Sequence, residues 1–211
     1  MTEEEARIWL EGRADGAGLA RLDRLVAMLR EEAGRQNLVS ASTLDAVWVR
    51  HVVDSAQLLD LAPNEMSNWL DIGTGAGFPG MVIAALRPEL PVMLVEPRRR
   101  RVEWLNTLAD ALGLSRVRVE CAKIERQQPF PAAVISARAV AWLPDLLQSA
   151  AAFSTPDTTW LLPKGASAAQ ELTVLPAPIR GMFHVEQSVT DPAARIIVGK
   201  GRIETGRSNI R

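Results

Sequence analysis

The pattern of hydrophobic and polar positions changes its period near residue 66. Before that point, apolar residues recur at helical spacing, first over residues 19–29 and again over residues 44–59. After it, short apolar runs alternate with helical segments. The chain is therefore predicted to have a helical N-terminal part, residues 1–65, and an alternating strand and helix domain, residues 66–211.

The second part of the chain predicts seven strands. They are residues 69–72, 92–95, 117–121, 132–136, 159–162, 182–189 and 196–198. Helices are predicted between the earlier strands, over residues 79–86, 98–112, 143–153 and 166–172. This alternation indicates a doubly wound α/β fold with a mostly parallel sheet. No helix separates the last two strands, which predicts an antiparallel hairpin at the end of the sheet.

Four glycines follow the first predicted strand within eight residues. The strand ends at Asp71 and Ile72, and the glycines are Gly73, Gly75, Gly77 and Gly80. Glycine tolerates positive φ angles and lets a ligand approach the backbone closely. A strand, a glycine loop and a helix N-terminus together present backbone N–H groups to a nucleotide-like ligand. A plain tight turn would not need so many glycines, so this loop is predicted to bind a ligand.

Two cofactors are compatible with the glycine spacing. Residues 75–80 fit the dinucleotide pattern GxGxxG, whereas the longer frame from Asp71 through Gly73 and Gly75 to Gly77 is usual for methyltransferases that use S-adenosylmethionine. S-adenosylmethionine is cationic at its methionine end and has no phosphates. Asp71 could therefore contact that end, but would repel a pyrophosphate. Glu96, at the end of the second strand, is expected to bind the ribose hydroxyls of either cofactor. These features favour S-adenosylmethionine.

Composition narrows the class of protein further. The formal net charge is −1, so no overall basic charge indicates nucleic-acid binding, although a local basic patch is compatible with it. One cysteine and two histidines predict neither a disulfide nor a metal site. No apolar run approaches the roughly 18 residues of a membrane span, and the acidic N-terminus differs from a signal peptide. A cytoplasmic protein without a membrane partner is expected.

Several stretches resemble one family, the bacterial guanine-N7 methyltransferases of small-subunit ribosomal RNA called RsmG or GidB. The specific match is Arg-His-Val-Val-Asp-Ser at residues 50–55, followed by Asp-Ile-Gly-Thr-Gly-Ala-Gly-Phe-Pro-Gly at residues 71–80. Supporting matches are Asn-Leu-Val-Ser at residues 37–40, Ile-Ser-Ala-Arg-Ala at residues 135–139 and Leu-Pro-Lys-Gly at residues 162–165. The resemblance extends from about residue 19 to the C-terminus.

The resemblance implies a fold and a cofactor pocket. The fold would be a Rossmann-like S-adenosylmethionine-dependent methyltransferase sheet of seven strands, with the helical part packed on it. By motif position, the cofactor contacts are Gly73, Phe78, Ile124, Glu125 and Arg138. Ile124 and Glu125 are expected to flank the adenine. The glycine frame and the ribose argument add Asp71, Gly75 and Glu96 to this pocket.

The implied substrate is a guanine of 16S ribosomal RNA in the small ribosomal subunit. Its N7 has a lone pair that is free of protons at neutral pH, so methyl displacement needs no base and no catalytic residue is assigned. Lys164 and Arg138 are candidates for positioning the substrate, and Arg50, His51 and Lys164 are candidates for contacting RNA. His51 and Asp54 could equally join the helical part to the sheet. RNA rather than DNA is the expected partner, and a monomer the expected state.

Two alternatives remain open at the level of sequence. A methyltransferase for another RNA, a protein or a small molecule would have the same cofactor loop, but would not depend on Arg50 or Lys164. A nucleotide-sensing or RNA-binding module with an inactive pocket is the other alternative. The intact glycine loop and Glu96 count against an inactive pocket. A cofactor-binding assay would distinguish an inactive pocket from a functional one.

Overall fold

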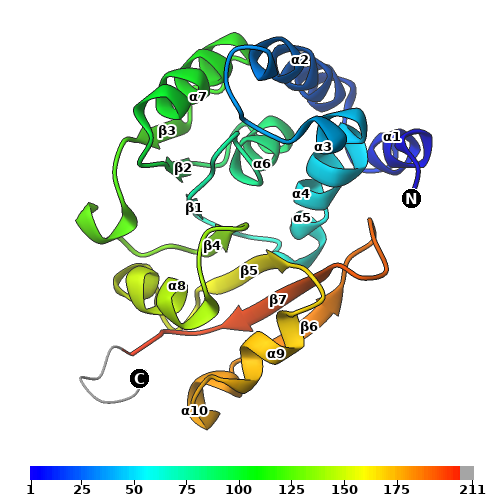
Figure 1. Ribbon diagram of the computed structural model, residues 1–211. Coiled ribbons are helices and arrows are strands. Elements are labelled where there is room, and N and C mark those ends of the chain that lie inside the picture. The colour runs from blue at the N-terminus through cyan, green and yellow to red at the C-terminus, as the bar shows by residue number, and fades with distance from the viewer. Residues whose placement is uncertain (205–211) are drawn as a thin grey trace.

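A seven-stranded mixed sheet forms the centre of the computed structural model, which describes residues 1–204 (Figure 1). The strands are β1 (Trp69–Ile72), β2 (Val92–Val95), β3 (Val117–Glu120), β4 (Val134–Ala137), β5 (Thr159–Lys164), β6 (Phe183–Gln187) and β7 (Arg195–Lys200). Their order in the sheet is β3-β2-β1-β4-β5-β7-β6. The first five strands are parallel, and β7 pairs antiparallel with both β5 and β6. The predicted doubly wound sheet with a final antiparallel hairpin is confirmed.

Helices cover both faces of this sheet (Figure 1). In the N-terminal part they are α1 (Glu3–Glu11), α2 (Gly16–Ala33), α3 (Ala41–Asp45), the π-helix η1 (Trp48–Val53), α4 (Asp54–Ala56) and α5 (Leu58–Leu61). Between and after the strands they are α6 (Gly80–Leu86), α7 (Arg99–Ala111), η2 (Ile124–Arg126), α8 (Leu143–Ala150), η3 (Ala151–Phe153), α9 (Ala168–Thr173) and α10 (Ala177–Arg180).

Successive strand residues enter two separate hydrophobic cores. In β1, Trp69 packs into the core that contains α1, α2, α6 and α7, whereas Leu70 and Ile72 pack into the core of α8 and α9. In β2, Leu94 and Val95 divide in the same way. Side chains alternate across a strand, so a central strand such as β1, covered on both faces, is buried at every residue. The N-terminal helices share the first core with the sheet, which holds them in a defined position against the glycine loop.

The helix predicted over residues 44–59 is interrupted. It divides into the end of α3, the π-helix η1 and two short helices, α4 and α5. The Glu3 carboxylate of α1 accepts hydrogen bonds from the backbone N–H groups of Trp48 (3.2 Å) and Val49 (2.8 Å) at the start of η1. A π-helix changes the direction of side chains relative to an α-helix and often occurs at functional sites. Here η1 carries Arg50 and His51 and leads directly to Asp54.

Two element boundaries differ from the prediction in ways that affect the site. β5 continues to Lys164 instead of ending at residue 162, because Pro163 and Lys164 still pair with Ile196 and Arg195 of β7. The helix predicted over residues 143–153 ends as α8 at Ala150 and continues as the 3-10 turn η3. The extension of β5 depends on its pairing with β7, which is a tertiary contact that the local sequence pattern did not indicate.

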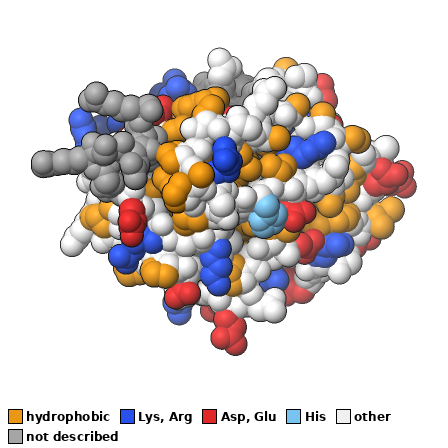
Figure 2. Space-filling model, turned by 90° about the horizontal axis from the view of Figure 1, so that it is seen from below, with side chains coloured by type: hydrophobic (Ala, Val, Ile, Leu, Met, Phe, Trp, Pro, Cys, Tyr) orange, Lys and Arg blue, Asp and Glu red, His pale blue; other side chains and the backbone are white. Residues whose placement is uncertain are grey.

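Among residues 1–204, no helix is both long enough and apolar enough to cross a membrane. Figure 2 shows the molecule from below the view of Figure 1, where Lys and Arg side chains alternate with Asp and Glu side chains and with hydrophobic ones. The described part of this face therefore has mixed charge rather than a continuous basic area.

Candidate functional site

The glycine loop connects β1 to α6 at the carboxyl end of the sheet. Gly73, Gly75 and Gly77 have φ angles of 65°, 60° and 109°, a region that residues with a side chain rarely adopt. A Cβ atom on Gly73 would also lie 2.6 Å from Cγ2 of Val140, in the loop that follows β4. Backbone conformation and close packing therefore both require glycine at residue 73.

Asp71 lies beneath this loop and is fully buried. Its Oδ1 accepts a hydrogen bond from the Ser136 hydroxyl of β4 at 2.7 Å, and its Oδ2 accepts one from the Gly80 N–H at 2.9 Å. Burial raises the pKa of Asp71 to about 6, and the bonds from Ser136 and Gly80 oppose that rise. The carboxylate joins β1, β4 and the start of α6. Direct contact of Asp71 with a cofactor stays a prediction that this inward orientation does not favour; its observed role is to hold the loop.

Glu96 lies at the edge of the same loop, immediately after β2. Its Oε2 accepts a hydrogen bond from the Gly75 N–H at 3.0 Å, and its Oε1 accepts one from the Arg98 N–H at 2.9 Å. Nη1 of Arg101 is 3.8 Å from Oε2, so the carboxylate is also ion-paired. Each carboxylate oxygen retains lone-pair capacity for a further donor such as a ribose hydroxyl. The ribose contact of Glu96 thus remains a prediction compatible with this geometry.

The residues predicted to bind the cofactor lie on four neighbouring strands. Ile124 and Glu125 follow β3 in the turn η2, Glu96 follows β2, the loop of Gly73–Phe78 follows β1, and Arg138 follows β4. In open α/β sheets, ligands bind at the carboxyl ends of the strands. The strand order β3-β2-β1-β4 places the strand ends that precede these residues in a row. Ile124 and Glu125 line a cavity of about 590 Å³ that is separate from the one Arg138 lines, so the adenine contact stays a prediction.

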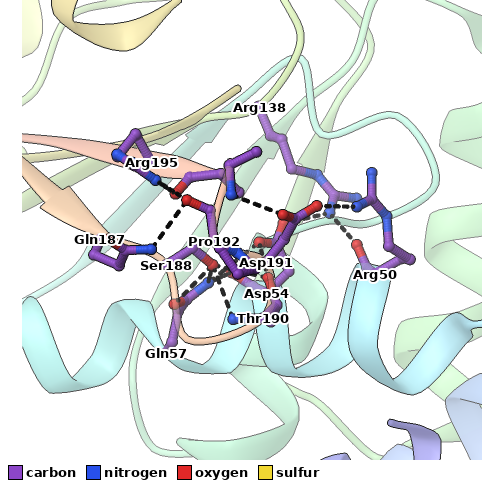
Figure 3. A network of polar contacts seen from close by, with 12 residues as sticks. Arg50, Asp54, Gln57, Arg138, Gln187, Ser188, Thr190, Asp191, Pro192 and Arg195 are labelled. Carbon is purple, nitrogen blue, oxygen red and sulfur yellow. Dashed lines mark hydrogen bonds and ion pairs between the residues drawn. The ribbon is translucent and has the colours of Figure 1, made fainter. Parts of the chain in front are cut away.

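Arg138 joins the end of β4 to the helical part of the chain (Figure 3). Its Nη1 donates to Oδ2 of Asp54 (3.0 Å) and to the carbonyl of Arg50 (3.1 Å), and its Nη2 donates to Nδ1 of His51 (3.0 Å). The His51 ring stacks on the Phe78 ring, with centroids 4.8 Å apart and an angle of 16° between the planes. The interpretation that His51 and Asp54 join the helical part to the sheet is confirmed.

The environment of His51 keeps its imidazole neutral. The residue is 8% exposed, so it lies inside the structure rather than on an open surface for RNA. Burial, followed by the charges of Arg138 and Arg50, lowers the pKa of His51 to about 3. RNA contact by His51 stays a prediction, and its observed contacts are with Arg138 and Phe78.

Acidification from pH 7 to pH 5 is expected to reduce the free energy of unfolding by about 2 kcal/mol through His51 alone. The unfolded chain takes up a proton near the ordinary pKa of 6.5, whereas folded His51 does not until about pH 3. Protons therefore favour the unfolded state across this window. Asp71, with a raised pKa, acts in the opposite direction between about pH 6 and 4.

Urea unfolding of the wild type and His51→Gln at both pH values measures this contribution. The Asp71 effect is common to both proteins and cancels in the comparison, so the variant should lose less stability on acidification. His184→Gln, at an exposed histidine, is the matched control and should behave as the wild type. Equal losses in wild type and His51→Gln would contradict the assignment.

A cavity of about 560 Å³ lies beside Arg138, at the carboxyl ends of β4 and β5. Its ionisable lining residues are Arg50, His51, Asp54, Arg138, Lys164, Glu171 and Asp191. Arg50 pairs with Asp191 at 3.2 Å, Arg138 pairs with Asp54 at 3.0 Å and Lys164 pairs with Glu171 at 2.8 Å. Every ionisable side chain of the lining therefore already has a described protein partner.

Lys164 is more enclosed than a lysine that binds phosphate groups at an open surface would be. Its side chain is 11% exposed, and its Nζ donates to Oε2 of Glu171 and, at 3.1 Å, to the carbonyl of Ala141. It thereby holds the loop that follows β4. RNA contact and substrate positioning by Lys164 both stay predictions, and its observed contacts are with Glu171 and Ala141.

Glu171, Thr190 and Asp191 of this cavity were not identified from the sequence. Glu171 lies on α9, and Asp191 and Thr190 lie in the loop between β6 and β7, where Thr190 contacts Asp54 (Figure 3). No motif surrounds any of them. Their part in the cavity follows from the position of β6 and β7 beside β5, which only the folded chain shows.

Comparisons with known proteins indicate the family and the fold of this chain. A relative from Erythrobacter litoralis, "Ribosomal RNA small subunit methyltransferase G", is 54% identical over 97% of this chain and 99% of its own length. The solved structure of the ribosomal protein L11 methylase of Lactobacillus delbrueckii subsp. bulgaricus has a TM-score of 0.56 and 12% identity, over 75% of this chain and 80% of that one. A mutant of MtNAS in complex with S-adenosylmethionine has a TM-score of 0.54 and 14% identity, over 86% and 75%.

The structural likenesses are below 25% identity and concern the fold alone. They agree with a Rossmann-like methyltransferase sheet. The family model described as "GidB: rRNA small subunit methyltransferase G" matches residues 19–193, which include the glycine loop, Arg138 and Lys164. On these grounds the chain belongs to the GidB family, rRNA small subunit methyltransferase G.

Proposed function

We propose that this protein transfers a methyl group from S-adenosylmethionine to N7 of a guanine in 16S ribosomal RNA of the small ribosomal subunit. The name of the Erythrobacter relative supports the substrate class. The observation that supports this type of reaction is the pairing of the ionisable side chains that line the cavity beside Arg138. All of its ionisable side chains are engaged in described ion pairs or, for His51, in a hydrogen bond from Arg138.

A lining of this kind suits a nucleophile that needs no base. A hydroxyl or a protonated amine must lose a proton on methylation, and a general base for it must be close and free to accept one. Guanine N7 carries a lone pair and no proton. Alignment of N7 with the methyl group would then be the principal contribution of the protein, worth about 7–11 kcal/mol at best.

The residues at the strand ends fit S-adenosylmethionine. The glycines leave the loop without side chains that would crowd the methionine end, Glu96 has lone-pair capacity for the ribose, and Ile124 offers a buried apolar contact for the adenine. When bound, the cofactor supplies a methyl group on a positively charged sulfur. The carboxylates of Asp54, Glu171 and Asp191 around the cavity are compatible with the positive charge that guanine acquires.

The partners follow from this reaction. RNA would approach the carboxyl edge of the sheet, where Arg50 is half-exposed and Arg98, Arg99 and Arg100 are exposed at the start of α7. Ribosomal subunits are assembled in the cytoplasm of bacteria, so we place the protein there. We propose that it acts as a monomer on RNA and not on DNA.

The direct test is methyl transfer from labelled S-adenosylmethionine to small ribosomal subunits from cells that lack this gene. The expected product is 7-methylguanosine after digestion of the 16S RNA. Gly73→Asp should abolish the transfer, because the added side chain would overlap Val140 and place a carboxylate in the loop. Lys164→Ala should bind the cofactor normally but transfer methyl more slowly, because the loop around Ala141 loses its anchor.

Absence of label from the RNA, in a preparation that binds S-adenosylmethionine, would overturn the ribosomal assignment and leave the cofactor assignment standing. Label in a different nucleoside would retain the enzyme class and change the nucleophile. Digestion of naked 16S RNA treated in parallel would show whether the assembled subunit is required.

A further inference from the structure

One donor near the glycine loop lacks an acceptor. Among the described residues, two buried side-chain polar atoms have no hydrogen-bond partner, Nε2 of His51 and Oγ1 of Thr74. The Thr74 hydroxyl lies close enough to the Asp71 carboxylate to lower its pKa, so it has an acceptor within reach. Buried polar groups without partners are rare and costly. The His51 nitrogen therefore calls for an explanation.

The hydrogen bond from Arg138 determines which nitrogen of His51 carries the proton. A guanidinium group has only N–H donors and no acceptor. Nδ1 of His51 lies 3.0 Å from Nη2 of Arg138 and must accept, so the proton of the neutral ring is on Nε2. His51 thus presents an N–H donor, held in one orientation by Arg138 on one side and by the Phe78 ring against its face.

Arg138 itself has unused donors beside this one. Of its five N–H bonds, three are used by described acceptors, two from Nη1 and one from Nη2. The Nε–H and the second Nη2–H have no partner among residues 1–204. The guanidinium carbon lies 5.2 Å from the centroid of the Phe78 ring, the same ring that His51 covers. Three unused donors therefore gather above Phe78 of the glycine loop.

The position of these donors in the sheet indicates which acceptor they suit. The strand order places the predicted adenine contacts at β3 and the ribose contact at β2, so the methionine end of the cofactor would extend over β1 towards β4. Phe78 follows β1, and Arg138 follows β4. The α-carboxylate is the anionic group of S-adenosylmethionine, and two oxygen atoms suit a cluster of N–H donors.

We propose that the Nε2–H of His51 binds the α-carboxylate of S-adenosylmethionine, together with the free N–H groups of Arg138. The proposal rests on the proposed use of this cofactor and deepens it, because it assigns a cofactor contact to the helical part of the chain. Asp54 already balances the charge of Arg138, and Asp191 that of Arg50. The neutral histidine therefore adds a directional donor rather than a further charge.

Isothermal titration with two ligands tests this assignment. S-adenosylmethionine has the carboxylate, whereas decarboxylated S-adenosylmethionine retains the adenosine, the sulfonium and the amine but lacks it. His51→Leu removes the donor and should weaken binding of S-adenosylmethionine about 10-fold or more. The same substitution should change binding of the decarboxylated ligand less than about 2-fold.

His51→Gln is the second variant, because its side-chain amide can both accept from Arg138 and donate to a carboxylate. It should recover part of the lost affinity, even if His51→Leu is destabilised. Equal weakening of both ligands, or of neither, would overturn the inference. An unchanged affinity with slower methylation at saturating cofactor would instead assign the donor to the substrate base.

The titrations distinguish failure of the histidine contact from failure of the proposed function. Failure of the wild type to bind S-adenosylmethionine would remove the proposed cofactor itself. Binding by the wild type with no loss in His51→Leu would leave the proposed function intact and reject only the histidine contact.

Discussion

Gly80→Ala is expected to destabilise the protein by about 3 kcal/mol, the upper part of the range for overpacking in a core. Gly80 begins α6, and a Cβ atom there would overlap Cδ2 of Leu94 and lie 2.8 Å from Oδ2 of Asp71. Asp71 on β1 and Leu94 on β2 are both 0% exposed, so neither side chain has open space to move into. The same Asp71 oxygen accepts the Gly80 N–H, which makes this contact the anchor of the glycine loop.

Urea unfolding followed by circular dichroism measures this effect, and Gly16→Ala provides the matched control. A Cβ atom at Gly16, the first residue of α2, would have no neighbour within 4 Å. That variant should be as stable as the wild type or more stable by about 0.5 kcal/mol, since alanine restricts the unfolded chain. Similar unfolding midpoints for the two variants would show that the packing around Gly80 is not as close as described.

Arg138→Met is expected to cost about 2–3 kcal/mol of stability and to weaken cofactor binding about 10-fold. Methionine preserves the length of the side chain but removes the donors to Asp54, to His51 and to the carbonyl of Arg50. Asp54 would keep only neutral partners, the Gln57 amide and the Thr190 hydroxyl. Because the Arg138 and Asp54 side chains are 19% and 17% exposed, the loss should be smaller than for a fully buried pair.

Arg138→Lys is the control for charge. Lysine keeps a cation near Asp54 but cannot reach three acceptors in a fixed plane, so its stability should lie between those of the wild type and Arg138→Met. Thermal unfolding and titration with S-adenosylhomocysteine would measure both effects. Wild-type stability in Arg138→Met would show that the helical part is held against the sheet by hydrophobic packing alone.

The fold was predictable because its signals are local. Strands that alternate with helices and the glycine spacing after Asp71 can be read within short windows of sequence, and the observed sheet agrees with them. The order of the strands, which decides how the cofactor candidates follow one another across the sheet, came only from the structure. Resemblance to a known family added Phe78, Ile124, Glu125 and Arg138, which no periodicity would have selected.

The interruption near Trp48 could not be predicted in this way. Apolar residues at helical spacing favour an α-helix over residues 44–59, but the backbone there forms a π-helix. Its first N–H groups are bound by Glu3, which is 45 and 46 residues away from its partners. Periodicity carries no information about such a distant cap, although the cap directs Arg50 and His51 towards the site.

The sequence by itself determined the alternating fold, the glycine loop and the acidic residues around it, because these depend on the conformational preferences of neighbouring residues. Only the tertiary structure decided which charges meet: Arg138 with Asp54, 84 positions apart, and Arg50 with Asp191, 141 positions apart. Ion pairs of that kind depend on strand order and on how loops cross the sheet edge. The same long-range packing bound one nitrogen of His51 to Arg138 and left the other without a partner among residues 1–204, on which the proposed cofactor contact of the helical part depends.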